Sequence, residues 1–142
     1  MNYFKQLQKH TAILTLTPKT PTEALSLTSA PLSVVVKEIG SVHVDIATIN
    51  LLGQIFALTL SPVNAEQLMA IAVQIRTNFW MLKFEEVIFA LNKGINGGYG
   101  KIFGNLSYIH LAEWLNTYLD DDRLIAVTDM RIKEKALASS IR

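Results

Sequence analysis

The histidine, acidic and serine residues of this 142-residue chain are the first candidates for chemistry. The histidines His10, His43 and His110 lie far apart, and none has an acid or a second histidine at a spacing typical of metal ligands. Glu85 and Glu86 stand at the start of an expected helix. The helix dipole favours acids there, so first-turn acids explain this pair better than general acid/base catalysis does. No serine lies in a Gly-x-Ser-x-Gly turn that would present a nucleophile.

The run Asp120, Asp121 and Asp122 is the densest group of acids. Successive helical residues point about 100° apart, so three acids in a row cannot converge on one ion. A calcium loop would need alternate acids and a later glutamate, and Arg123 follows instead. We therefore expect solvated helix surface. Because the chain also has no cysteine, the sequence predicts no metal, no cofactor and no enzymatic activity.

Residues 96–105 form a segment unlike the rest of the chain. It contains two aromatic residues, one lysine and four glycines, which permit positive φ angles and close backbone approach: Gly97, Gly98, Gly100 and Gly104. Ile102 follows the Gly-Lys pair where a phosphate-binding loop has Ser or Thr, and no strand is expected before it. The segment is therefore not predicted to bind phosphate.

Three interpretations of this loop remain open. Tyr99 and Phe103 could fold back to fill the core between two helices. They could instead anchor a partner protein, with Lys101 at the rim, or stack on the bases of single-stranded nucleic acid. We take Tyr99, Lys101 and Phe103, with the glycines that shape the loop, as the candidate partner-binding residues.

The elements that must position the loop are expected to be helices. Pro31 suits the first position of a helix and Gly40 the residue after its end, although the β-branched run 34–36 leaves a strand as the alternative. Ser41 would cap a second helix that runs to about Leu60, where Ser-Pro ends it.

The third helix has the clearest start, because Asn64 is a good N-cap and Gln67 stands at the capping-box position. Its inward residues recur at helical spacing: Leu68, Ala72, Ile75 and Phe79. A bulky corner at residues 79–82 leads into a fourth helix that carries Glu85 and Glu86 and ends at Gly94. A last helix begins at Ser107, and its apolar face is Leu111, Trp114, Leu115, Tyr118 and Leu119.

The two ends of the chain are expected to differ from this bundle. Residues 1–16 could form a short amphipathic helix, but proline, serine and threonine dominate residues 17–31, which reads as a linker and not a core element. We therefore predict a flexible arm over residues 1–30. Residues 31–142 are predicted to form a single all-α bundle of about five helices, with a charged C-terminal helix that extends the last one.

The overall composition favours an interface. Half of the residues are hydrophobic, 18% are charged, and the mean hydropathy is +0.28. This surplus indicates a buried oligomer or partner surface; an apolar monomeric core is the alternative. The net charge of +1 gives no electrostatic reason to bind nucleic acid. The most apolar stretch, Val42–Leu60, holds polar residues and is shorter than a comfortable membrane span, and no secretory signal is visible, so a cytoplasmic protein is expected.

Three segments resemble an uncharacterised family from Bacteroidetes genomes, their phages and mobile elements. Residues 79–83 match its Tyr-Trp-Tyr-Leu-Lys-like corner, residues 97–104 its Gly-Lys-Tyr-Gly-Lys-like loop, and residues 111–118 its Leu-Glu-Trp-Leu-Asn-Lys-Tyr-like helix. Gly98 stands where the family's loop has its first basic residue. The layout is similar, more distantly, to small phage proteins that load or inhibit a replicative helicase.

The sequence and this resemblance together predict a non-enzymatic protein-binding accessory factor. The resemblance implies that its partner is a replicative helicase or another replisome component. A self-assembling structural or phage assembly protein, forming a homo-oligomer, is the alternative. A nucleic-acid-binding module is a second alternative, and the neutral charge balance disfavours it.

Overall fold

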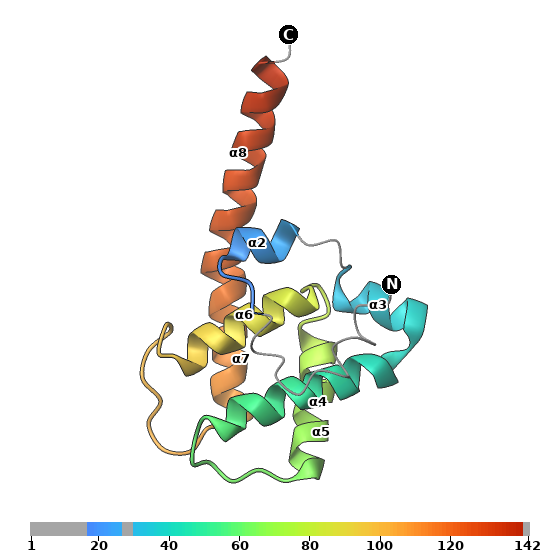
Figure 1. Cartoon of the computed structure of the whole chain (residues 1–142), viewed down its shortest axis with the longest axis vertical. Coiled ribbons are helices and arrows are strands. Elements are labelled where there is room, and N and C mark those ends of the chain that lie inside the picture. Colours follow the sequence, from blue (N-terminus) through green and yellow to red (C-terminus); the bar gives the residue numbers. More distant parts are fainter. Residues whose placement is uncertain (1–16, 27–29, 141–142) are drawn as a thin grey trace.

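The computed structural model describes residues 17–26 and 30–140. Its elements in chain order are α2 (Pro21–Ser26), α3 (Leu32–Ile39), α4 (Ser41–Ala57), α5 (Ala65–Asn78), α6 (Phe84–Ile95), α7 (Tyr108–Thr117), the π-helical segment η2 (Tyr118–Arg123) and α8 (Leu124–Ser140). Helices α7, η2 and α8 follow one another without a break and form one long rod (Figure 1). With α3, α4, α5 and α6, the rod makes the all-α bundle of about five helices that the sequence predicts.

Helix α6 lies at the centre of the bundle. All of its residues from Phe84 to Leu91 are buried except Phe89, which is partly exposed. It packs against α7, α2 and α4, and Figure 1 shows it in the middle of the molecule. A helix that is buried nearly all round must carry apolar residues on every face, and α6 does so from Phe84 to Leu91 apart from its two first-turn acids.

Several predicted helix ends are confirmed. The Asn64 side chain accepts from the Gln67 amide at 2.8 Å, and the Gln67 side chain accepts from the Asn64 amide at 2.9 Å, which completes the capping box of α5. Gly40, with a φ of +87°, ends α3 as predicted. Because residues 34–36 are helical, the strand alternative is wrong. Helix α4 ends at Ala57, three residues before the predicted Leu60.

Part of the flexible arm predicted over residues 1–30 packs on the bundle in the structure. Pro21–Ser26 form α2, whose Ala24 is 0% exposed, and α2 packs on α6, η2 and α8. The Lys83 ammonium also donates to the Leu25 carbonyl at 2.7 Å. Tertiary contacts therefore hold a helix that is too short to be stable alone. The expected amphipathic helix at residues 1–16, with His10, lies outside the described residues, as do residues 27–29.

The far end of α8 projects from the bundle. All residues from Arg131 to Ser140 are exposed, and Figure 1 shows this part of the rod standing clear of the other helices. The predicted extension of the last helix into a charged C-terminal helix is thus confirmed for the described residues.

Candidate functional site

The glycine-rich loop begins as the C-terminal cap of α6. Gly97, at a φ of +86°, donates its N–H to the Gly94 carbonyl at 3.0 Å, and Gly98 donates to the Lys93 carbonyl at 2.8 Å. These two bonds form the Schellman motif, which satisfies the last carbonyls of a helix and needs a left-handed residue. A Cβ on Gly98 would also overlap the Lys93 side chain. Two of the four glycines are therefore explained by ending a helix.

Helix α6 ends at Ile95, one residue after the predicted end at Gly94, and Gly94 itself lies buried inside the last turn. A Cβ at this position would overlap the ring atoms of Trp114 on α7. The missing side chain thus serves close packing between α6 and α7.

Tyr99 is held against the helices and not presented to solvent. Its hydroxyl donates to Asp122 at 2.6 Å, and the Lys93 ammonium lies 4.7 Å from the centroid of its ring. Lys93 also pairs with the same Asp122 oxygen at 2.9 Å. Burial, with the neighbouring Asp122, raises the pKa of Tyr99 above its ordinary value, so the hydroxyl stays a proton donor. Tyr99 therefore fixes the start of the loop.

Leu106 fixes the other end of the loop. Its side chain is 4% exposed, and its amide donates to the Ser61 hydroxyl at 2.6 Å. Between the two fixed points, Gly100 and Gly104 have φ angles of +112° and +80°, which side-chain-bearing residues rarely adopt. They bracket a three-residue tip at 101–103.

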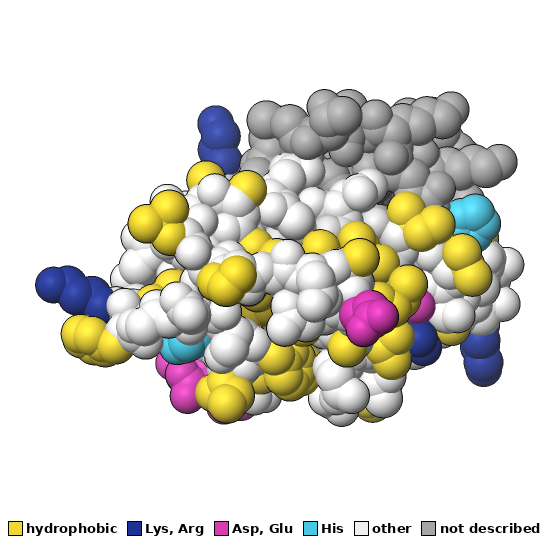
Figure 2. Space-filling view, turned by 90° about the horizontal axis from the view of Figure 1, so that it is seen from below, with side chains coloured by type: hydrophobic (Ala, Val, Ile, Leu, Met, Phe, Trp, Pro, Cys, Tyr) yellow, Lys and Arg dark blue, Asp and Glu magenta, His cyan; other side chains and the backbone are white. Residues whose placement is uncertain are grey.

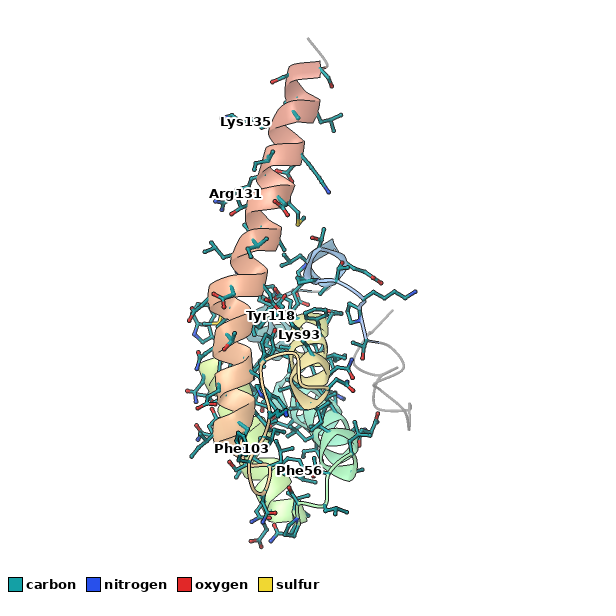
Figure 3. The ribbon with its side chains drawn as sticks, turned by 90° about the vertical axis from the view of Figure 1, so that its left-hand side faces the viewer. Phe56, Lys93, Phe103, Tyr118, Arg131 and Lys135 are labelled. Atoms are coloured by element: carbon teal, nitrogen blue, oxygen red, sulfur yellow. The ribbon has the colours of Figure 1, made fainter. Side chains whose placement is uncertain are left out.

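The tip presents one aromatic ring. Phe103 is 84% exposed, Lys101 is exposed, and Ile102 is partly buried against the core. Figure 3 shows Phe103 at the end of the molecule opposite the part of α8 that carries Arg131 and Lys135. The two rings of the candidate site are thus separated: Tyr99 packs inward, and Phe103 points away from the core.

Two shallow hollows lie beside the tip, on either side of Leu106. One, of about 250 Å³, is lined by residues 59–61, 102 and 104–106. The other, also about 250 Å³, lies between the start of α5 and the start of α7, and its lining includes Phe56, Val63, Ile71 and Tyr108. Segments 58–64 and 101–109 therefore form one continuous surface, which we name the charge-poor end.

Charged residues are almost absent from the charge-poor end. Segment 46–65 contains no Asp, Glu, Lys or Arg, and segment 94–112 contains only Lys101. The charge-poor end also exposes large apolar side chains: Leu58 at 61%, Leu60 at 102% and Ile109 at 68%. Figure 2 views this end, where hydrophobic and uncharged side chains cover most of the described surface, basic side chains stand at the edges, and a few acidic side chains lie between them. The uncharged segments are visible in the sequence, but composition averaged over the whole chain hides them.

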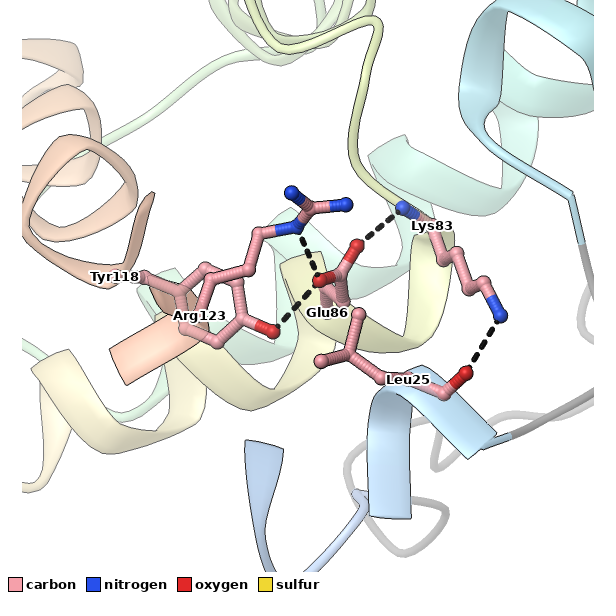
Figure 4. A network of polar contacts seen from close by, with 5 residues as sticks. All are labelled: Leu25, Lys83, Glu86, Tyr118 and Arg123. Carbon is pink, nitrogen blue, oxygen red and sulfur yellow. Dashed lines mark hydrogen bonds and ion pairs between the residues drawn. The ribbon is translucent and has the colours of Figure 1, made fainter. Parts of the chain in front are cut away.

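A buried polar network lies behind the loop, around Glu86 of α6 (Figure 4). Glu86 is 0% exposed. One carboxylate oxygen accepts from the Tyr118 hydroxyl at 2.9 Å and from Arg123 at 2.8 Å, and the other accepts from the Lys83 amide at 2.8 Å. Three donors therefore engage the carboxylate, which leaves no exposed face for a substrate.

The π-helical geometry of η2 makes this network possible. A π-helix bonds residue i to residue i+5, so Tyr118 and Arg123 stack on one face and both reach Glu86. Glu85 and Glu86 lie in the first turn of α6, as predicted. Both side chains are also buried and engaged in polar interactions, so the helix dipole is not the only feature that explains them. The prediction of solvated surface holds for Asp120 and Asp121, which are exposed, and is wrong for Asp122, which bonds Tyr99 and Lys93.

Burial and the adjacent Glu86 carboxylate raise the pKa of Tyr118 above its ordinary value. The folded state therefore keeps the tyrosine proton above pH about 10, where the unfolded chain releases it. Stability from this group is complete below pH about 10 and is lost as the pH rises further.

The substitution Tyr118→Phe tests this linkage. At pH 7 it should lower the free energy of unfolding by about 1.5–3 kcal/mol, the usual contribution of a hydrogen bond to a charged group. Between pH 10 and 11 the gap between the natural chain and the variant should shrink by about 1 kcal/mol. Urea unfolding at pH 7, 9, 10 and 11 measures both values, and a gap that stays constant to pH 11 would contradict the linkage.

Of the described histidines, His110 has a structural role. His110 lies in the first turn of α7, where its Nδ1 accepts the Ser107 amide at 3.0 Å, so this histidine helps to cap the helix. Among residues 17–26 and 30–140, no group of three His, Asp or Glu side chains is placed to hold a metal ion.

None of the described helices combines the length and the apolar character that a membrane span requires. The chain matches no protein-family model, no curated protein and no solved structure.

Proposed function

We propose that this chain is a non-enzymatic protein-binding accessory factor that docks its partner through the charge-poor end. The observation that carries the proposal is Phe103, an aromatic side chain that is 84% exposed on a tip fixed at both ends. Aromatic anchors dominate the energy of many protein interfaces, and interface centres are poor in charge. A fixed loop also loses little conformational entropy on binding.

Other functions have less support. The most buried acid, Glu86, is saturated by its three donors, so it suits stabilisation of the bundle better than catalysis. Nucleic-acid binding would need a cluster of basic residues, and Lys101 is the only charge in segment 94–112. Protein docking is therefore the function that the surface supports best.

The first partner to test is a replicative helicase, with other replisome components next. This choice comes from the more distant similarity of the family's layout to small phage proteins that load or inhibit a replicative helicase. The cytoplasm, which the sequence analysis expects, is the compartment that we propose.

The substitution Phe103→Ala tests the docking face. Loss of an interface anchor typically costs at least about 2 kcal/mol, so the Kd for the purified helicase should rise about 30-fold. Biolayer interferometry with the full chain immobilised measures the change. Because the ring is largely exposed, the thermal midpoint should not change.

Trp80→Ala is the matched control, since Trp80 is also an exposed aromatic residue, at 53%. It follows the end of α5 that lies away from the charge-poor end, and α5 is about 21 Å long at 1.5 Å per residue. Equal helicase binding by the natural chain and by Phe103→Ala would show that the loop is not part of the docking face. Binding of single-stranded DNA that weakens steeply as salt is added would instead favour nucleic acid.

A further inference from the structure

The charge-poor end carries both a projecting ring and a hollow that the ring does not fill. Phe103 points into solvent, while its neighbours Ile102 and Gly104 line the hollow formed with residues 59–61. The hollow measures about 250 Å³. An apolar cavity of about 150 Å³ accepts benzene, so this hollow has room for a phenyl ring.

We propose that a second copy of this chain covers the charge-poor end, as a two-fold dimer in which each Phe103 enters the hollow of the other copy. This inference rests on the docking face of the proposed function, which a second copy and a helicase would occupy in turn and not together. In a two-fold interface the same patch meets itself, so residue i contacts residue j and residue j contacts residue i. A projection beside a matching hollow is the shape that such an interface requires.

The charge distribution favours this pairing over others. A surface that meets itself has the same charges on both sides, and like charges that come close to one another across the two-fold axis repel. The charge-poor end carries only Lys101 in segments 58–64 and 101–109, so little repulsion opposes its self-pairing.

The projecting part of α8 is the competing surface, because Ile132 and Leu137 are exposed there at 61% and 63%. Residues 131–140 contain three bases, Arg131, Lys133 and Lys135, and one acid, Glu134. Pairing of two such segments would bring an excess of positive charge together. The charge-poor end is therefore the better surface for a second copy.

Sedimentation equilibrium of the full chain over a concentration series tests the proposal. The natural chain should be a dimer, and Phe103→Ala should raise the dimer dissociation constant at least about 100-fold, because one substitution removes two anchors. Trp80→Ala should dimerise like the natural chain. Circular dichroism and an unchanged thermal midpoint show that each variant is folded.

A photocrosslink locates the contact. The residue p-benzoylphenylalanine, placed at position 103, keeps an aromatic projection and should crosslink to residues 59–62. Mixing ¹⁴N-labelled and ¹⁵N-labelled chains shows whether the crosslink joins two copies. Crosslinks to α8, or only within one chain, would overturn the pairing.

The outcomes separate this inference from the proposed function. A chain that stays monomeric at millimolar concentration, or a dimer that Phe103→Ala does not weaken, overturns the pairing. If the chain is monomeric but Phe103→Ala weakens helicase binding, only the pairing fails. If the dimer forms through Phe103 and no replisome protein binds, the pairing stands and the accessory function fails.

Discussion

Replacing Glu86 with alanine is expected to lower the free energy of unfolding by about 3–5 kcal/mol. Breaking a fully buried ion pair costs about this much. Here the Arg123 side chain is 32% exposed, so water solvates part of its charge, but the Tyr118 hydroxyl is fully buried and adds the cost of an unsatisfied donor. Glu86 is 0% exposed, and the loss of its carboxylate would orphan Arg123 and the Tyr118 hydroxyl, together with the Lys83 amide. Urea unfolding at pH 7, followed by circular dichroism, measures the change.

Glu66→Ala is the matched control, because Glu66 is also a first-turn acid but is exposed. Its loss should cost no more than about 1 kcal/mol, the usual range of the dipole interaction. A triple replacement of Glu86, Tyr118 and Arg123 by apolar residues of similar volume should recover most of the stability, since only the Lys83 amide then loses its Glu86 acceptor. Equal losses in Glu86→Ala and Glu66→Ala would show that the network contributes little.

The sequence predicts those helices whose signals are local. The capping box of Asn64 and Gln67 marks the start of α5 because both bonds form within one turn. The residues at positions 72, 75 and 79 are buried as their spacing predicts. Short-range chemistry of this kind is readable without a structure, whereas α2 depends on contacts with α6 and α8 that are distant in sequence.

The candidate site was only partly predictable for the same reason. The composition of residues 96–105 indicates a loop with special backbone angles, and three of its glycines have positive φ. It does not show that Tyr99 and Phe103 have different environments. That difference depends on Asp122, which is 23 residues beyond Tyr99 and accepts its hydroxyl bond. The π-helical turn that brings Asp122 to this position has no recognisable sequence signal.

Gly94→Ala is expected to lower the free energy of unfolding by about 2–3 kcal/mol. A Cβ at position 94 would overlap the Trp114 ring, and overpacking of a close-packed core costs about 1–3 kcal/mol or more. Alanine gains about 1 kcal/mol over glycine in a helix, but this gain is smaller than the cost of moving a ring that is 4% exposed. Guanidinium unfolding of the full chain measures the balance.

Gly53→Ala is the control for helix propensity, because Gly53 lies inside α4 and a Cβ there meets nothing within 4 Å. This substitution should stabilise the chain by about 1 kcal/mol.

The decisive comparison combines Gly94→Ala with Trp114→Ala, which alone should cost about 3–5 kcal/mol. Without the ring to overlap, Gly94→Ala should stabilise this background by up to about 1 kcal/mol, so the sign of its effect reverses and the coupling energy is about 3 kcal/mol. The same loss in both backgrounds would mean that the glycine is required for another reason than contact between α6 and α7.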